Sequence, residues 1–217
     1  PDCKEFDSDF LRVMLGIPFG YLLMLNSKLT LHASAVNKNN KGIIFMGKSG
    51  MGKSTIAYDL ILKDFKLITE DICAINNNEI LHSYSLLKIS NTGHLNGMNL
   101  FEGNKYNFPT DSLGRQGFKV KDRFLSKKNN ACSLAYILID AKIESVAIKR
   151  LRLNESIKYI LNNTFKTHPI ANDLLLKKNL KQVIDFSSKV QVYAVLCSKN
   201  NLHDRNISIY KHLSERI

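Results

Sequence analysis

The sequence of 217 residues contains no tryptophan, few acidic side chains and few cysteines. The cysteines are far apart and form no CxxC pair: Cys3, Cys73, Cys132 and Cys197. This spacing predicts neither a zinc site nor a disulfide framework, and reduced thiols fit a cytoplasmic protein. Apolar residues make up 44% and charged residues 23% of the chain, without repeats or low-complexity linkers. These values exclude a disordered tail, a collagen-like fibre and a disulfide miniprotein.

No apolar run is long enough to cross a membrane. The longest, residues 10–25, is interrupted by one arginine, one proline and two glycines. It is too short and too often broken for a transmembrane span or a signal sequence. We therefore expect no membrane association. Because the chain starts at Pro1 and not at a methionine, we also expect sequence upstream of it.

The shortage of acidic residues gives a net charge of +12. Residues 115–128 contribute +5 and residues 141–190 contribute +6. This pattern predicts a basic groove that attracts an acidic peptide or small protein, although an ordinary solvated surface would look the same. The chain has no helix-turn-helix, zinc-finger or aromatic RNA-binding motif, so we do not predict nucleic acid as a partner.

The hydrophobic pattern predicts an α/β protein in which strands and helices alternate. We expect helices over residues 8–25, 53–63, 155–165, 170–187 and 204–215, and strands over residues 29–36, 42–46, 66–69, 72–75, 134–140 and 190–196. Pro18 predicts a kink in the first helix, and Asn154 is expected to cap the third. Residues 90–130 are expected to form loops with short elements. The predicted organisation is one domain over residues 1–217, with an N-terminal helix at about 8–25, a nucleotide-binding core at about 29–90 and a C-terminal part at about 130–217.

The most specific motif is GKSGMGKS at residues 47–54, which matches G-x-x-x-x-G-K-[ST] without a deviation. It follows an apolar strand and opens a helix, so its backbone N–H groups can point at phosphate oxygens. Lys53 would reach the β- and γ-phosphates of ATP, and the Ser54 hydroxyl would ligate Mg²⁺. The predicted nucleotide-binding residues are Gly47, Lys48, Ser49, Gly50, Met51, Gly52, Lys53, Ser54 and Thr55.

Two further features narrow the reaction to phosphoryl transfer. Glu70 and Asp71 follow Lys53 by seventeen and eighteen residues, the length of a helix and a returning strand. One carboxylate could bind Mg²⁺ while the other accepts the proton of an attacking hydroxyl; a solvated acidic turn is the alternative. His32 lies on the strand that leads into the loop strand, and its pKa near neutrality suits a phosphate contact. A hydrogen-bonded core histidine would fit that position equally well.

These segments together resemble the catalytic domain of HPr kinase/phosphorylase. The resemblance rests on LHASAV at residues 31–36, the loop fifteen residues after His32, and ITED at residues 68–71. It is closer still to the short HPr-kinase-like proteins of peptide-modification clusters, which include lasso-peptide precursor kinases. LHSYSLLKI at residues 81–89 also resembles that group. The N-terminal domain and the usual C-terminal signature of HPr kinase find no counterpart in the sequence.

The resemblance implies a PEPCK-like P-loop fold, a mixed sheet flanked by helices, and ATP-dependent phosphorylation of a serine hydroxyl. The acceptor would belong to a peptide or small protein, such as a lasso-type precursor peptide. The resemblance assigns Asp71 as the proton acceptor, places Lys53 and His32 on the transferred phosphate, and places Ser54 on Mg²⁺. Glu70 stands where the family usually has aspartate, so the metal ligand is either Glu70 or Asp71.

Other family positions are less clear in this sequence. Glu102 is a poor match for the family's later metal-binding glutamate. Arg115 or Arg123 could complete the phosphate clamp, and Arg123 is preferred because it lies nearer the strand at residue 134; both could also be ordinary surface charges. A kinase of a small-molecule hydroxyl and a nucleotide-binding regulator without efficient transfer remain alternatives. HPr kinase is a hexamer, so a homo-oligomer is an alternative to a monomer for this chain.

Overall fold

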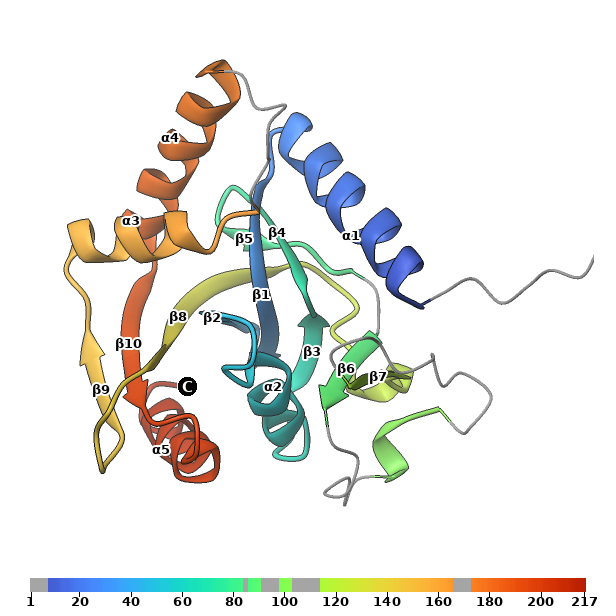
Figure 1. Cartoon of the computed structure of the whole chain (residues 1–217), viewed down its shortest axis with the longest axis vertical. Coiled ribbons are helices and arrows are strands. Elements are labelled where there is room, and N and C mark those ends of the chain that lie inside the picture. Colours follow the sequence, from blue (N-terminus) through green and yellow to red (C-terminus); the bar gives the residue numbers. More distant parts are fainter. Residues whose placement is uncertain (1–7, 84–85, 91–97, 103–113, 166–172) are drawn as a thin grey trace, which may run out of the picture.

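The structure, a computed structural model, describes residues 8–83, 86–90, 98–102, 114–165 and 173–217 (Figure 1). Its helices are α1 (Ser8–Leu25), α2 (Lys53–Ile61), α3 (Leu153–Asn162), α4 (Asp173–Lys189) and α5 (Leu202–Ser214). Its strands are β1 (Leu29–Lys38), β2 (Lys41–Gly47), β3 (Lys66–Thr69), β4 (Ile72–Asn76), β5 (Glu79–Ile80), β6 (Leu86–Ser90), β7 (Arg115–Lys119), β8 (Asn130–Asp140), β9 (Ala147–Arg150) and β10 (Gln191–Cys197). Two short 3₁₀ helices are η2 (Met98–Leu100) and η4 (Asp122–Phe124).

The main sheet is mixed and flanked by helices, as predicted. β2, β8 and β10 run parallel, with Leu138 of β8 opposite both Gly47 and Val195. Their carboxyl ends therefore meet at one edge, which is where ligands bind in open α/β sheets. β1 runs antiparallel to β2, so its residue His32 also reaches this edge.

β3 and β4 follow each other along the second side of β1. Thr69, the last residue of β3, pairs with Ala35, whereas Ile72, the first residue of β4, pairs with His32. The two residues between the strands fall in a break of the ladder. This break carries the acidic pair that the sequence analysis singled out.

Helices cover both faces of the sheet, and alternate strand residues divide between the two cores (Figure 1). Phe45 of β2 belongs to the core beneath α2 and α5, with Ile56 and Ile209. The next residue, Met46, belongs to the opposite core beneath α3 and α4, with Ile160. Because both faces are buried, this strand has the continuous apolar sequence that is typical of parallel strands.

Most predicted elements are confirmed, and α1 has the predicted bounds, continuing through Pro18. The third helix differs: it ends at Asn162, and Asn154 lies inside its first turn, with Arg152 at the N-cap. Residues 163–165 leave the helix because their backbone hydrogen-bonds with β1. The sequence analysis did not separate β5, β6, β7 and β9, and parts of the predicted 90–130 and 170–187 segments lie outside the described residues.

Among the described helices, none is long and apolar enough to cross a membrane.

Candidate active site

The P-loop connects β2 to α2 and needs glycine at several positions. Gly47, Gly50 and Gly52 have φ values of 151°, 81° and 70°, which residues with a side chain rarely adopt. Space is also short, because a Cβ on Gly47 would lie 2.7 Å from the carbonyl oxygen of Leu138. The loop therefore curls tightly in front of α2, whose first backbone N–H groups have no partner within the helix. This is the geometry of an anion-binding loop.

Lys53 is the first residue of α2, and its side chain folds back into the loop. Its Nζ donates a hydrogen bond to the Gly47 carbonyl oxygen at 2.9 Å and lies 3.5 Å from that of Lys48. Burial lowers the pKa of Lys53, and the negative charges of Glu70 and Asp71 oppose this effect. The ammonium group is thus fixed inside the loop where phosphate oxygens would lie.

Ser54 joins the loop to the acidic pair. Its Oγ donates to Oε1 of Glu70 at 2.6 Å. Burial raises the pKa of Glu70 to about 7, and the nearby charge of Asp71 acts in the same direction. A hydroxyl and a carboxylate suit Mg²⁺, which keeps several waters and takes its remaining ligands from substrate phosphates. No group of three or more His, Cys, Asp or Glu side chains that could hold a metal occurs within the described ranges.

Asp71 lies between His32 and Lys88. Its Oδ1 is 3.0 Å from Nδ1 of His32, and its Oδ2 is 2.8 Å from Nζ of Lys88. Burial would raise the pKa of Asp71, but the hydrogen bond with His32 and the charge of Lys88 together lower it below its ordinary value. Asp71 is therefore ionised at neutral pH and stands next to the histidine that the sequence analysis placed on the phosphate.

Three contacts to the site were not predicted from the sequence. Lys88, on β6, lies in the LHSYSLLKI segment, so the resemblance pointed to its neighbourhood but not to its contact with Asp71. Asn163 follows α3; its Oδ1 accepts the Gly47 N–H at 2.9 Å, and its backbone oxygen accepts the His32 N–H at 2.8 Å. No sequence pattern marks an asparagine after a helix as a partner of the loop.

The third contact comes from Arg205 of α5, which is fully buried. Its guanidinium donates to the carbonyl oxygens of Met51 and Gly52. It also donates to Oδ1 of Asn206, whose Nδ2 in turn donates to Asp59 on α2 at 2.5 Å. The last helix thereby supports the loop through its backbone carbonyl groups.

The arginine preferred from the sequence lies elsewhere. Arg123, in η4, lines a hollow with Asn37 and Asn39, near the turn between β1 and β2, and its Nη2 donates to the carbonyl oxygen of Asn99 at 3.2 Å. The seven-residue strand β2 separates this hollow from the loop, a distance of roughly 20 Å. The preference for Arg123 is thus corrected: the fold carries it to the opposite end of β2.

Arg115, at the start of β7, is the arginine that affects the site. Its positive charge adds to the lowering of the pKa of Lys53 by burial and opposes the rise that burial causes in the pKa of Glu70, as a smaller effect in both cases. The carboxylate of Glu102 forms an ion pair with Lys119 at 2.8 Å and not a contact with the acidic pair.

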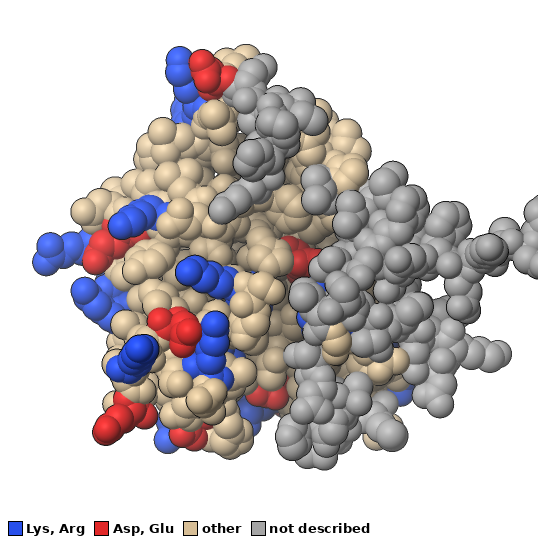
Figure 2. All heavy atoms as spheres, in the orientation of Figure 1, with Lys and Arg blue, Asp and Glu red and all other residues tan. Residues whose placement is uncertain are grey.

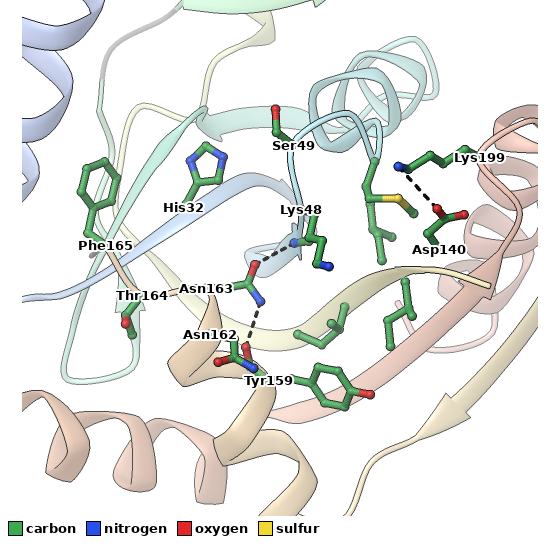
Figure 3. Close-up of a pocket in the computed structure, with 15 residues that line it drawn as sticks. His32, Lys48, Ser49, Asp140, Tyr159, Asn162, Asn163, Thr164, Phe165 and Lys199 are labelled. Atoms are coloured by element: carbon green, nitrogen blue, oxygen red, sulfur yellow. Dashed lines mark hydrogen bonds and ion pairs between the residues drawn. The ribbon is translucent and has the colours of Figure 1, made fainter. Parts of the chain in front are cut away.

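A cavity of about 810 Å³ opens beside the loop (Figure 3). The loop, the ends of β2 and β8, and the end of α3 with the residues that follow it form its walls. The lining residues are His32, Gly47, Lys48, Ser49, Met51, Ile137, Leu138, Ile139, Asp140, Tyr159, Asn162, Asn163, Thr164, Phe165 and Lys199. Neither Glu70 nor Asp71 lines it, whereas His32, which contacts Asp71, does.

Residues 24–101 match the family model described as the HPr Serine kinase C-terminal domain. This segment is similar to the HPr kinase C-terminal domain. The HPr kinase/phosphorylase of Lachnoclostridium phytofermentans is 37% identical over 51 residues, which are 24% of this chain and 16% of that protein. The matched part is thus less than a fifth of the relative. The solved structure of the Hpr(Ser) kinase/phosphatase from Coxiella burnetii is similar with a TM-score of 0.37 and 14% identity, over 86% of this chain and 98% of that one.

The HPr kinase-like segment contains the P-loop, His32, Glu70, Asp71 and Lys88, so every contact among these residues lies within residues 24–101. The supports from Asn163 and Arg205 lie outside it. On the face drawn in Figure 2, Lys and Arg side chains alternate with Asp and Glu over β9 and α5 and form no continuous basic patch there. The basic groove for an acidic substrate therefore stays a prediction.

Proposed function

We propose that the chain is an ATP-dependent serine kinase whose acceptor hydroxyl belongs to a peptide or small protein. The observation that carries the proposal is the meeting of the P-loop with two carboxylates. Ser54 of the loop bonds Glu70, while the adjacent Asp71 bonds His32, so phosphate-binding and proton-accepting groups lie side by side. Phosphoryl transfer depends mainly on positioning and charge neutralisation, which this arrangement can supply.

In this proposal Asp71 accepts the proton of the serine hydroxyl as its oxygen attacks the γ-phosphorus of ATP, and ADP leaves. Two contacts orient the Asp71 carboxylate, one to His32 and one to Lys88. Lys53 and the loop N–H groups bind the phosphates. Ser54 and Glu70 would hold Mg²⁺, which when bound neutralises charge on the phosphoryl group. Arg115 replaces Arg123 as the arginine proposed for the phosphate clamp, because its charge acts on Lys53 and Glu70.

The test is mass spectrometry of the protein incubated with ATP, Mg²⁺ and serine-containing peptides, lasso-type precursor peptides among them. We expect one acceptor to gain one phosphate. Asp71→Asn should reduce transfer by about 10²–10⁴-fold, because it removes the proton acceptor, with nucleotide binding retained. Lys53→Ala should lose nucleotide binding, because it removes the cation inside the loop.

The matched control is Asp185→Asn, which removes an exposed carboxylate paired with Lys189 on α4. It should leave transfer unchanged. Substantial transfer by Asp71→Asn would contradict its role as base. If ATP binds but no peptide gains mass, small hydroxyl metabolites are tested next, and a phosphorylated metabolite would replace the peptide in the proposal.

A further inference from the structure

We propose that the 810 Å³ cavity binds the nucleoside half of the nucleoside triphosphate, while the acceptor approaches the loop beside Glu70 and Asp71, which do not line this cavity. This inference rests on the proposed function, because it requires that the phosphates of the nucleotide lie on the P-loop. It adds a binding site for the nucleoside and states from where the acceptor reaches the loop.

Continuity with the phosphate site is the first argument. Gly47, Lys48, Ser49 and Met51 all line the cavity, so the loop that would bind the phosphates forms part of its wall (Figure 3). The cavity also lies at the carboxyl ends of the parallel strands, where α/β sheets bind ligands.

The loop also contacts the acidic pair, Glu70 and Asp71, which lies outside the cavity. There Ser54 bonds Glu70, and Asp71 bonds Lys88. In the proposed function, Ser54 and Glu70 would hold Mg²⁺ there, and an acceptor hydroxyl must reach Asp71 to lose its proton, so this position is needed for the acceptor and not for the nucleoside. His32 both contacts Asp71 and lines the cavity, which places it at the boundary between the cavity and the acidic pair.

The lining of the cavity suits a base and a sugar. Ile139 and the rings of Tyr159 and Phe165 supply apolar surface for a flat base, and the side chains of Asn162 and Thr164 supply donors and acceptors for polar ring and sugar atoms (Figure 3). The volume falls within the range of about 300–1,000 Å³ for small-molecule sites.

The cavity wall is also tied to the loop. Asn163 accepts the Gly47 N–H with Oδ1 and donates to the Tyr159 carbonyl oxygen through Nδ2 at 2.8 Å. One side chain therefore couples the wall that would contact the base to the backbone that would contact the phosphates. These hydrogen bonds hold the loop and the cavity wall in a fixed relative position before a ligand binds.

The experiment compares the binding of ATP with that of tripolyphosphate, both with Mg²⁺, by isothermal titration calorimetry. The affinity for tripolyphosphate measures binding to the loop alone, whereas the affinity for ATP measures binding to the loop and the cavity together. We expect the wild-type protein to bind ATP at least about tenfold more tightly. Asn162→Trp fills the cavity from an exposed position on α3 and should weaken ATP binding about tenfold without changing tripolyphosphate binding.

Tyr159→Ala provides a second variant, because it removes apolar wall and keeps the backbone carbonyl that Asn163 uses. It should also weaken ATP selectively. Asn154→Trp is the matched control: the residue is exposed at the other end of α3, does not line the cavity, and should leave both affinities unchanged.

The outcomes separate the two proposals. If neither ATP nor tripolyphosphate binds, the proposed function fails and the inference fails with it. If tripolyphosphate binds as tightly as ATP, or if Asn162→Trp and Tyr159→Ala leave ATP binding unchanged, the inference is overturned and the loop remains a phosphate site. A rise in the KM of the acceptor at unchanged ATP affinity in these variants would also overturn it, because the cavity would then hold the acceptor.

Discussion

Asp71 has a φ of 71°, an unusual backbone conformation for a residue that joins two strands. Left-handed residues with a side chain are uncommon and are often found at functional sites. Here the conformation interrupts the ladder between β3 and β4 and brings the Asp71 carboxylate to His32 and Lys88. Neighbouring Glu70 reaches Ser54 instead, so two adjacent acidic residues acquire different partners and different pKa values.

At the residue scale, the two candidate arginines give a direct test. We expect Arg115→Ala to reduce the kcat of phosphoryl transfer by about 10²-fold, because a positive charge beside Lys53 and Glu70 is lost. Arg123→Ala should leave kcat unchanged, because Arg123 lies at the far end of β2. Steady-state kinetics on both variants provide the measurement. Equal losses in the two variants, or a loss only in Arg123→Ala, would reject the assignment of Arg115.

At the element scale, α5 supports a loop to which it is not adjacent in sequence. Arg205 is fully buried and donates to two carbonyl oxygens of the loop, at Met51 and Gly52. A buried guanidinium is costly to desolvate unless its donors are satisfied, and here backbone oxygens and Asn206 accept them. The contact explains why the last helix packs against α2.

We expect Arg205→Met to lower the free energy of unfolding by about 1–3 kcal/mol, because the loop carbonyl groups lose their donors while staying buried. Urea denaturation is the measurement, with nucleotide titration as a second readout that should show weaker binding. Lys211→Met is the control, since Lys211 is exposed on the same helix. Unchanged stability and unchanged binding in Arg205→Met would mean that the loop keeps its shape without α5.

At the scale of the whole molecule, two buried thiols in one of the cores should lower the stability of the protein at alkaline pH. Cys73 and Cys132 are fully enclosed in the core beneath α3 and α4. Burial raises the pKa of the Cys73 thiol to about 12 and that of Cys132 well above its usual value. Both thiols therefore stay protonated in the folded state at a pH where the unfolded chain loses their protons.

Stability should consequently fall as the pH rises above about 8.5, the ordinary pKa of a cysteine. Since the unfolded state binds fewer protons there, each thiol lowers the free energy of unfolding by about 1.4 kcal/mol at about pH 9.5. Urea denaturation at about pH 7 and about pH 9.5 would measure the loss. The Cys73→Ala/Cys132→Ala double variant should lose about 3 kcal/mol less over this interval than the wild-type protein. The same loss in both proteins would show that these thiols are not protected.

The sequence by itself determined the features that depend on short-range spacing. The P-loop needs neighbouring small residues, a lysine and a serine, and the buried strand before it has an apolar run that can be recognised from the sequence. The resemblance then named the partners of the loop, and the family model covers the same segment, residues 24–101. The division into one domain and the nature of the acceptor stay predictions.

Only the tertiary structure decided which distant side chains complete the site. Asn163 and Arg205 contact the loop across 116 and 154 residues of sequence. Such a contact depends on one side chain and not on a repeating pattern, so the sequence cannot predict it. Arg123 was preferred over Arg115 because of its position along the chain, but the course of β2 and β7 sets their places in space. Spacing along the sequence determines the local turn, whereas the packing of the sheet determines which charges face it.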